Sequence, residues 1–338
     1  MKDESRKMKV ERDISLLPYN TFRMDVKAKW FAEYNTVDEL RELLVRYKDE
    51  QILHIGAGSN LLFTKDFGGV VLHSAMRRAR CTNEDNDHVW IEADNGLVLD
   101  ELIEQLCDMG ISGMENLSHI PGEVGASAVQ NVGAYGVEAK DVIESVRAMA
   151  VADGKERVFM NAECRYGYRD SIFKNELKGQ YIITHVVYKL NKHFEPKLDY
   201  GNLRSEAGDA STPMSVREAV VQIRKQKLPE VSEIGSAGSF FKNPIVPRNV
   251  YEDIAAQYEK VPHYEQDGGV KIPAAWLIEQ CGWKGKSLGG ARCYEKQPLV
   301  LVNAHNAMPE DIVNLAAAIC EDVKEKFGIK ISPEVNYI

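Results

Sequence analysis

Hydrophobic and polar positions alternate along the chain in helix-like and strand-like patterns. Residues 37–49 place leucines and a tyrosine at helical spacing, and residues 51–55, QILHI, predict a short buried strand directly afterwards. Residues 97–110 predict a second amphipathic helix, which Gly110 would end in the left-handed conformation. No internal repeat is detectable. This succession indicates a fold that mixes α-helices and β-strands.

Turn signals and further periodic runs extend the same pattern. Asp153-Gly154 stands between two alternating runs and predicts a β-hairpin, because both residue types tolerate positive φ. In the last third, residues 308–328 predict a helix, and residues 298–303 and 329–335 predict strands.

A helix end and a change in composition predict a domain boundary. Ser215 and Glu218 have the spacing of a capping box and predict the start of a helix that ends before Leu228-Pro229. The composition changes over residues 226–235. A chain of 338 residues, 44% of them hydrophobic, can bury a core and is expected to form two or three domains.

The charge balance narrows the classes of partner. The formal net charge is −9 and no block of basic residues occurs, which disfavours nucleic acid and anionic membrane surfaces. No apolar run approaches the roughly 18 to 20 residues that span a bilayer, and residues 1–13 are too polar for a signal peptide. We therefore expect a cytoplasmic protein, and a monomer, without a nucleic-acid or membrane partner.

The cysteines carry no recognisable chemistry. The chain has six, at positions 81, 107, 164, 281, 293 and 320, with no C-x-x-C pair. This spacing indicates neither a disulfide framework nor a zinc site. We expect buried free thiols and no bound metal.

Two glycine-rich loops give the first chemical signal. HIGAGSNLLF (54–63) follows a predicted strand, but it lacks the third glycine of a dinucleotide fingerprint and does not open a helix, which disfavours a Rossmann NAD site. The second loop, 119–136, interleaves glycines with Ser127, Gln130 and Asn131. Glycines let backbone N–H groups approach a diphosphate, and these small polar side chains could complete its hydrogen bonding. Each loop alone could be an ordinary tight turn; together they suggest a bound dinucleotide outside the Rossmann class.

Ser239, in GSAGSFFKNP (235–244), does not fit a nucleophile elbow. Phe240 stands directly beside it and no glycine follows at position 241. The residues themselves leave open that Ser239 only caps a turn. Taken alone, Arg169 could be a surface charge beside Asp170, and Glu334 a solvated carboxylate.

Eight separated segments resemble, in order and spacing, the UDP-N-acetylenolpyruvoylglucosamine reductase family over roughly residues 17–338. They are NTF (20–22), GAGSNLLF (56–63), IPGEVGASAVQNVGAYG (120–136), CRYGYRDSIFK (164–174), KLP (227–229), GSFFKNP (238–244), AAWLIEQCG (274–282) and PEV (333–335). LDYGNL around Tyr200 is similar to the type I subgroup. The chain departs from the family pattern at Asn336, where an arginine is usual, and at Arg23, where a glycine is usual. Arg23 could replace the missing charge.

The resemblance implies a mixed α+β fold with an FAD-binding domain of the vanillyl-alcohol-oxidase type in two parts. The implied divisions are a polar N-terminal extension (1–16), two FAD-binding subdomains (17–75 and 76–225), and a substrate-binding domain (226–338) whose C-terminal strand returns to the active site. Noncovalent FAD is the implied cofactor. Its implied contacts are Gly56, Ala57, Gly58, Ser59, Asn60, Pro121, Gly122, Gly125, Ala126, Ser127, Asn131, Gly133, Tyr135 and Ile183.

The resemblance also implies a reaction in two halves. NADPH reduces FAD and leaves. The enolpyruvyl ether of UDP-N-acetylglucosamine then takes a hydride at C3 and a proton at C2, which gives UDP-N-acetylmuramate for peptidoglycan synthesis. The enolate that forms is basic enough to take a proton from a serine held in position.

Three residues carry the implied chemistry. Ser239 is the implied proton donor, and the planar fork of Arg169 can hold the substrate carboxylate. Glu334 would act protonated, or share a proton, because an anionic carboxylate would repel the enolate. The implied substrate contacts are Tyr168, Tyr200, Arg224, Lys227, Asn243 and Gln297.

Two other interpretations remain. One is a flavin oxidase of the same fold, which often attaches FAD covalently; His54 and His119 lie in the glycine loops, without an evident attachment motif. The other is a non-catalytic nucleotide-sugar binder, which should lack the combination of Ser239, Arg169 and Glu334.

Overall fold

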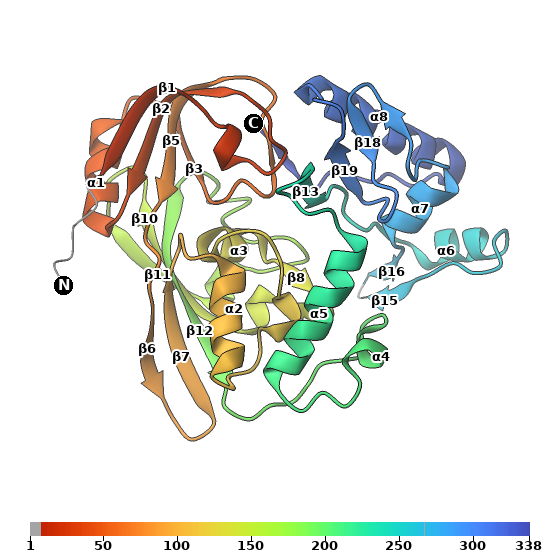
Figure 1. Ribbon diagram of the computed structural model, residues 1–338, viewed down its shortest axis with the longest axis horizontal. Coiled ribbons are helices and arrows are strands. Elements are labelled where there is room, and N and C mark those ends of the chain that lie inside the picture. The colour runs from red at the N-terminus through yellow and green to blue at the C-terminus, as the bar shows by residue number, and fades with distance from the viewer. Residues whose placement is uncertain (1–7, 267) are drawn as a thin grey trace. The chain divides into compact units, whose positions relative to one another are not determined.

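The computed structural model describes residues 8–266 and 268–338, which form two compact units (Figure 1). Unit 1 takes residues 27–57 and 67–224 together with the described residues before 15. Unit 2 takes residues 15–26, 58–66 and 225–338. The chain therefore passes between the units several times, the last time at the end of the helix for which the sequence predicts a boundary.

The first sheet of unit 1 has the strand order β1-β2-β5-β3, with β2, β5 and β3 parallel. Helix α1, whose Thr36 side chain accepts a hydrogen bond from the Glu39 N–H, connects β2 to β3 and buries its leucines on this sheet. Of the expected N-terminal extension, residues 1–7 lie outside the described residues, while most of the remainder forms β1. The predicted helix is confirmed, and the predicted strand forms, but only Ile55 of it is buried. The elements are β1 (Lys9–Ser15), β2 (Lys27–Tyr34), α1 (Val37–Arg46), β3 (Ile52–Ile55) and β5 (Phe67–Ser74).

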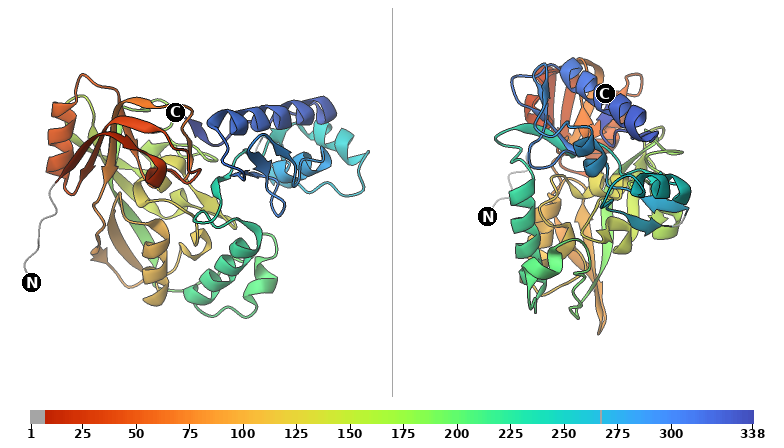
Figure 2. Two further views of the ribbon diagram at one scale, coloured as in Figure 1. Left: turned by 45° about the horizontal axis from the view of Figure 1, so that its top comes forward. Right: turned by 90° about the vertical axis from the view of Figure 1, so that its right-hand side faces the viewer.

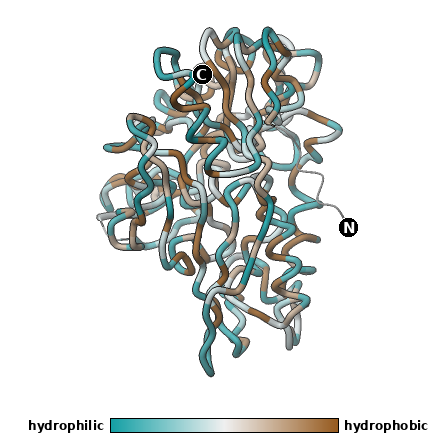
Figure 3. Tube along the Cα trace, turned by 90° about the vertical axis from the view of Figure 1, so that its left-hand side faces the viewer, coloured by the Kyte–Doolittle hydropathy of each residue, from teal (hydrophilic) through white to brown (hydrophobic). Residues whose placement is uncertain are grey.

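The second sheet of unit 1 is antiparallel, with the order β11-β10-β12-β7-β6. The predicted hairpin at Asp153-Gly154 is confirmed as the β10–β11 connection, in which Gly154 takes φ +68°. In Figure 3 the polar tip of the β6–β7 hairpin stands out in teal below the hydrophobic strands. The strands are β6 (Ala79–Glu84), β7 (His88–Asp94), β10 (Ile143–Ala150), β11 (Glu156–Met160) and β12 (Tyr181–Asn191).

Helices and short strands complete unit 1. Gly110 follows α2 at φ +75°, which confirms the predicted helix end. The predicted capping box at Ser215 and Glu218 is wrong: the helix begins at Pro213, and Thr212 and Ser215 exchange side-chain-to-backbone hydrogen bonds of 3.2 Å. The elements are α2 (Leu99–Asp108), α3 (Val124–Gln130), β8 (Gly133–Ala134), β9 (Val137–Glu138), α4 (Leu203–Ala207) and α5 (Pro213–Lys227), whose last three residues belong to unit 2.

A buried asparagine links the two sheets of unit 1 to the second glycine loop. The Asn95 amide group donates to the Tyr34 hydroxyl (2.9 Å) and to the Ile183 carbonyl (2.7 Å). Its side-chain oxygen accepts from Ser74, and its backbone carbonyl accepts from Gly125. The side chain is only 2% exposed, so each of these bonds forms away from water.

Unit 2 has a four-stranded antiparallel sheet, β13-β19-β18-β17, on which α8 packs, and a three-stranded sheet, β14-β16-β15 (Figure 2). The elements are β13 (Gly235–Ser239), β14 (Ile245–Val246), α6 (Arg248–Ala255), β15 (Tyr264–Gln266), β16 (Gly269–Lys271), α7 (Ala274–Gln280), β17 (Ser287–Leu288), β18 (Ala291–Cys293), β19 (Val300–Asn303) and α8 (Pro309–Phe327).

The C-terminal strand differs from the prediction. Residues 329–335 do not form a strand; instead β20 (Asn336–Tyr337) pairs in parallel with β4 (Leu61–Leu62). Pro333 makes a single bridge to Phe241. The pairing partner lies more than 270 residues away in the sequence, so local periodicity could not place this strand.

The six cysteines are free thiols. Cys107, Cys164 and Cys293 are buried as expected. Cys281 and Cys320 are only partly buried, and Cys81 is exposed because β6 is an exposed polar strand, so the prediction is wrong for these three. Among the described residues no group of three potential metal ligands occurs, and no described helix is long and apolar enough to cross a membrane.

An ion pair connects α5 to α2 within unit 1. The Arg217 guanidinium, 8% exposed, donates to both carboxylate oxygens of Asp100 at 2.5 and 3.2 Å and lies 3.3 Å from Glu104. Asp100 also accepts the His119 N–H. Burial alone would raise the pKa of Asp100, but the Arg217 hydrogen bond and the His119 N–H outweigh it and hold the pKa below its ordinary value.

Removing the Asp100 charge should therefore destabilise unit 1. We expect Asp100→Asn to lower the free energy of unfolding by about 2 kcal/mol, because Arg217 keeps only Glu104 as a carboxylate partner. A carboxyl with a depressed pKa contributes stability above its unfolded pKa of about 4 and loses it as the pH falls through the folded pKa. Urea unfolding should show the difference from wild type shrinking below about pH 4. Asp87→Asn, at an exposed carboxylate, is the control; an equal loss in both variants would contradict the ion pair's role.

Candidate functional site

The first glycine loop follows β3. Gly58 has φ +64°, and a Cβ there would lie 2.1 Å from the Tyr19 carbonyl oxygen. The Gly58 carbonyl accepts the Thr21 N–H, whereas the N–H groups of Ala57, Gly58 and Asn60 have no hydrogen-bond partner in the described part of the chain. The glycine is thus needed by the protein's own backbone, and it leaves neighbouring donors for an anionic ligand.

The second glycine loop enters α3. The Val124 and Gly125 N–H groups bond to the Leu97 and Asn95 carbonyls, while those of Gly122 and Glu123 find no acceptor among the described residues. A Cβ at Gly125 would lie 2.7 Å from that of Asn95. This loop therefore also combines close packing on protein atoms with unused backbone donors.

The polar side chains of the second loop have partners within the protein. Ser127 Oγ donates to the Val124 carbonyl at 2.7 Å. Asn131, fully buried at φ +48°, donates to the Gly167 carbonyl and accepts from the Lys140 N–H. Gln130 accepts from Lys174. These side chains hold the loop's shape, so its free donors are mainly backbone groups.

A tight turn presents Tyr168 and Arg169. Gly167 and Asp170 exchange backbone hydrogen bonds of 3.0 and 3.1 Å on either side of them. The Arg169 guanidinium donates to the Gly133 carbonyl and lies 5.2 Å from the centre of the Tyr168 ring. Since Asn131 holds the Gly167 carbonyl, Arg169 is fixed beside the second glycine loop.

Arg224 and two tyrosines form a further group in unit 1. Arg224 donates to the His119 carbonyl at 3.0 Å and lies near the Tyr135 hydroxyl. The Tyr135 and Tyr200 rings meet edge to face, with centroids 6.2 Å apart. Burial raises the pKa of the Tyr135 hydroxyl. The predicted substrate contacts Tyr200 and Arg224 therefore lie next to the predicted flavin contact Tyr135.

The Ser239 side chain is exposed at the end of β13 in unit 2. The β13–β19 register shifts between Ser236 and Ser239, and Gly238 has φ +66°. Such an irregularity can re-aim a side chain. The Ser239 hydroxyl makes no hydrogen bond within residues 8–266 and 268–338, and hence caps no turn there.

Glu334 lies on the chain segment beside Ser239. Its N–H donates to the carbonyl of Phe240, the next residue after Ser239, at 2.7 Å. On the other side, the Asn60 amide group donates to the Glu334 carbonyl at 3.4 Å. Unit 2 thus brings together the predicted proton donor, the predicted acid and one end of the first glycine loop.

The two departures from the family pattern have structural roles. Asn336 donates to the Asn60 carbonyl from both its backbone (3.1 Å) and its side chain (3.3 Å). Arg23, at φ +59°, donates to the carbonyls of Ser232 and Glu233. These hydrogen bonds of Arg23 hold the backbone of unit 2. They do not support the expectation that Arg23 replaces the arginine missing at position 336.

The side chains of two of the remaining predicted contacts hydrogen-bond to the protein's own backbone. The Asn243 side chain accepts the Ala274 N–H at the start of α7, and the Gln297 side chain accepts the Leu299 N–H at 3.3 Å. Ile183 contributes the carbonyl that Asn95 holds. Lys227 is the last residue of α5. Of these, Ile183 belongs to unit 1 and the others to unit 2.

One of the two histidines considered for covalent flavin attachment has its ring engaged. His54 Nε2 lies 2.8 Å from the Tyr34 hydroxyl, and burial lowers the pKa of His54 to about 3. The His54 contact disfavours covalent attachment at that ring. The backbone of His119 bonds to Asp100 and Arg224.

Sequence reasoning missed a buried group beneath the glycine loops. His73 on β5 lies 3.2 Å from carboxylates of both Glu33 and Glu123. No local pattern reveals this group, because its members are 40 and 50 residues apart in the sequence.

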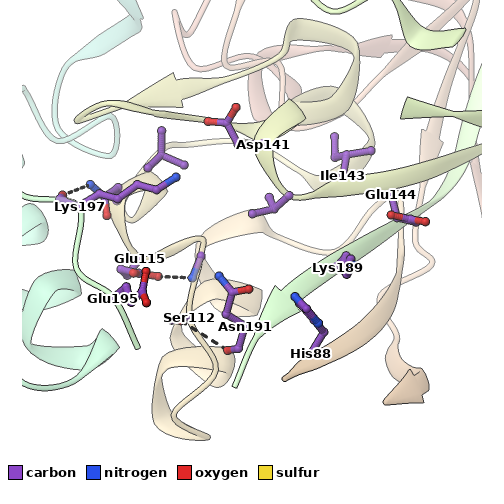
Figure 4. Close-up of a pocket in the computed structure, with 14 residues that line it drawn as sticks. His88, Ser112, Glu115, Asp141, Ile143, Glu144, Lys189, Asn191, Glu195 and Lys197 are labelled. Atoms are coloured by element: carbon purple, nitrogen blue, oxygen red, sulfur yellow. Dashed lines mark hydrogen bonds between the residues drawn. The ribbon is translucent and has the colours of Figure 1, made fainter. Parts of the chain in front are cut away.

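A pocket of about 290 Å³ lies elsewhere in unit 1 (Figure 4). Lys189 and Asn191 of β12 line it together with His88 of β7 and the buried Glu115, which accepts the Gly113 N–H. None of the predicted site residues lines this pocket, so it does not mark the predicted chemistry.

Comparison with known proteins assigns the chain to a class of flavin-binding reductases. Residues 28–159 match the FAD binding domain family, and residues 229–338 match the C-terminal domain of UDP-N-acetylenolpyruvoylglucosamine reductase. The solved structure of that reductase from Thermus caldophilus, 24% identical, covers 98% of this chain and 99% of its own with a TM-score of 0.71. The fold is therefore a mixed fold of helices and strands with an FAD-binding domain and the C-terminal domain of that reductase.

Curated relatives define the family. A Bacteroides fragilis protein named UDP-N-acetylenolpyruvoylglucosamine reductase is 47% identical over 333 residues, which cover 97% of this chain and 100% of that one. A Flavobacterium johnsoniae protein of the same name is 42% identical over 337 residues, covering 98% and 100%. The chain belongs to the UDP-N-acetylenolpyruvoylglucosamine reductase family.

The crowding around Gly58 gives a prediction that needs no ligand. Gly58→Ala should lower the free energy of unfolding by about 3 kcal/mol, since it adds overlap with the Tyr19 backbone to the cost of positive φ. Gly328→Ala is the matched control in unit 2: Gly328 has φ +67° but nothing within 4 Å of its Cβ position, so we expect about 1 kcal/mol. Urea unfolding measures both. Equal losses would contradict the close approach.

Proposed function

We propose that the chain reduces the enolpyruvyl ether of UDP-N-acetylglucosamine to UDP-N-acetylmuramate, with NADPH as reductant and noncovalent FAD as cofactor. The family assignment supports the substrate and the cofactor. The observation that carries the chemistry is the exposed Ser239 hydroxyl, without a hydrogen-bond partner in the described residues, on the segment beside Glu334. A turn-capping serine would use its hydroxyl within the protein.

The two glycine loops would hold the FAD diphosphate through their backbone. The unbonded N–H groups of Ala57, Gly58 and Asn60, and of Gly122 and Glu123, fit an anionic ligand. The chemistry supplied at this site would be hydride transfer through FAD from NADPH to C3 of the substrate, with the loop backbone holding the FAD diphosphate. The side chains of Ser127 and Asn131 would act indirectly, by fixing the shape of the second loop.

Ser239 would supply the proton to C2. The register shift before it can re-aim its side chain, and the hydrogen bond between Glu334 and Phe240 fixes the two segments against each other. Holding the donor in place reduces the entropy lost in reaching the transition state. Glu334 would donate a hydrogen bond to the developing enolate.

Arg169 would hold the substrate carboxylate. Its guanidinium spans two hydrogen bonds in one plane, and the Gly133 carbonyl already anchors part of it. Tyr168, Tyr200, Arg224, Lys227, Asn243 and Gln297 would contact the remainder of the substrate, with Lys227 and Tyr200 at its diphosphate. We place the FAD-binding part in residues 17–75 and 76–225 and the substrate-binding part in 226–338, acting as a monomer in the cytoplasm.

The two half-reactions provide the test. Purified protein should be yellow, NADPH should bleach it under anaerobic conditions, and the enolpyruvyl substrate should restore the colour. Ser239→Ala should leave bleaching nearly unchanged and slow the recovery of colour by several orders of magnitude, because only the second half needs a proton at C2. Stopped-flow absorbance follows both steps. Ser236→Ala, at a buried serine of the same strand, is the control, and equal slowing of both halves by Ser239→Ala would indicate a structural serine.

Two substitutions separate hydrogen bonding from proton transfer at Glu334. Glu334→Gln keeps the shape and a donor, whereas Glu334→Asp keeps the acid but withdraws it by one methylene. We expect Gln to preserve more of the reoxidation rate than Asp, and to alter the fall in rate at alkaline pH. Single-turnover rates measured across pH provide the comparison. A nearly wild-type Asp variant with an inactive Gln variant would show that Glu334 transfers a proton itself.

A further inference from the structure

A charged group buried in unit 1 lies beneath both glycine loops. His73 is 5% exposed and faces two carboxylates: Nδ1 lies 3.2 Å from Glu33, and Nε2 lies 3.2 Å from Glu123. The ring also stacks on Phe31, with an interplanar angle of 25°. Glu33 comes from β2, and Glu123 comes from the loop that enters α3. The group therefore ties the second glycine loop to the first sheet.

A doubly protonated imidazole can donate to both of these carboxylates. An imidazolium donates from both nitrogens, whereas a neutral ring has one donor and would turn a lone pair toward the second carboxylate. Burial by itself would lower the pKa of His73, but the hydrogen bonds and charges of Glu123 and Glu33 outweigh it and raise the pKa.

The same group reaches the first glycine loop. A Cβ at Gly56 would lie 3.0 Å from the second carboxylate oxygen of Glu123. One oxygen of Glu123 thus contacts His73 while the other packs against Gly56. Glu123 also carries one of the unbonded backbone N–H groups of the second loop.

We propose that His73, held as an imidazolium between Glu33 and Glu123, is a positioning residue that fixes the two glycine loops for the FAD diphosphate. The proposal rests on FAD as the bound cofactor. The charged group carries a net charge of −1, one positive against two negative. Loss of the His73 proton changes this to −2 beside loops that hold an anion, and it removes one of the two hydrogen bonds.

The expected effect of pH follows from the raised pKa. A group whose pKa is raised by its folded surroundings contributes stability below its unfolded pKa of about 6.5 and loses it as the pH rises through the folded pKa. Other titratable groups face this region: His54 on β3, which stays neutral because burial lowers its pKa to about 3, and Tyr34 on β2, whose pKa burial raises. FAD should accordingly be held more weakly at alkaline pH, as His73 loses its proton.

The test measures release of FAD from the holoenzyme, without NADPH or substrate. After dilution, the rise of free-flavin fluorescence gives the release rate between about pH 6 and about pH 9. For wild type we expect release to accelerate with pH. His73→Gln should release FAD about tenfold faster than wild type near pH 6, with little further dependence on pH. His193→Gln, at an exposed histidine paired with Asp87, is the control and should follow wild type.

A second variant keeps the test decisive if His73→Gln does not fold. Glu123→Gln removes the partner that raises the pKa of His73 most, so the acceleration should occur at lower pH than in wild type. Release rates and pH profiles of His73→Gln and Glu123→Gln that match wild type would overturn the proposal. Because no turnover is measured, a protein that binds FAD in this way but does not reduce the substrate would contradict the proposed function alone.

Discussion

The hydrogen bonds of Asn95 are the constraint on which unit 1 depends. One buried amide connects Tyr34 and Ser74 of the first sheet to Ile183 of the second, and its backbone carbonyl holds Gly125. The missing side chain at Gly125 allows that approach, since a Cβ would overlap Asn95. Removing one partner would leave buried polar groups unsatisfied, which costs more than the bond itself contributes. The path of the second glycine loop is therefore set by the junction of the sheets.

In unit 2 the corresponding constraint is a set of main-chain bonds between distant segments. Glu334 bonds to Phe240, and Asn60 bonds to both Glu334 and Asn336. A functional constellation must be held within about 0.5 Å of its working geometry, and these bonds restrict the segments that carry Ser239 and Glu334. A register shift such as the one before Ser239 can re-aim a side chain.

Sequence reasoning succeeded where the cause of a structure is local. The spacing of leucines in α1, the left-handed Gly110 and the hairpin at Gly154 each depend on a few adjacent residues. It failed where the partner is remote in the sequence. The position of β20 is set by its pairing with β4, and not by the pattern of hydrophobic residues around it. The start of α5 was misplaced for another reason. Thr212 and Ser215 have the same spacing as Ser215 and Glu218, and it is the first pair that forms the reciprocal hydrogen bonds at the start of the helix.

The candidate site shows the same limit. Ser239, Arg169 and Glu334 came from the order of the family's motifs, because composition and spacing alone left each of them with an ordinary structural explanation. The group around His73 could not be predicted at all, since nothing in the sequence shows that residues from three elements share one buried position.

The discontinuity of unit 2 has a consequence for biosynthesis. Residues near the N-terminus bond to residues that are synthesised much later. The Phe22 carbonyl accepts from Asn303, 281 positions further along the chain, and the Thr21 carbonyl accepts from Ser236. Unit 1 is fully synthesised at residue 224, when the stretches 15–26 and 58–66 still lack the strands of unit 2. Contacts between residues that lie so far apart in the sequence form slowly. The hydrogen bonds that these two stretches make with residues 303, 336 and 338 can therefore form only after most of unit 2 has been made.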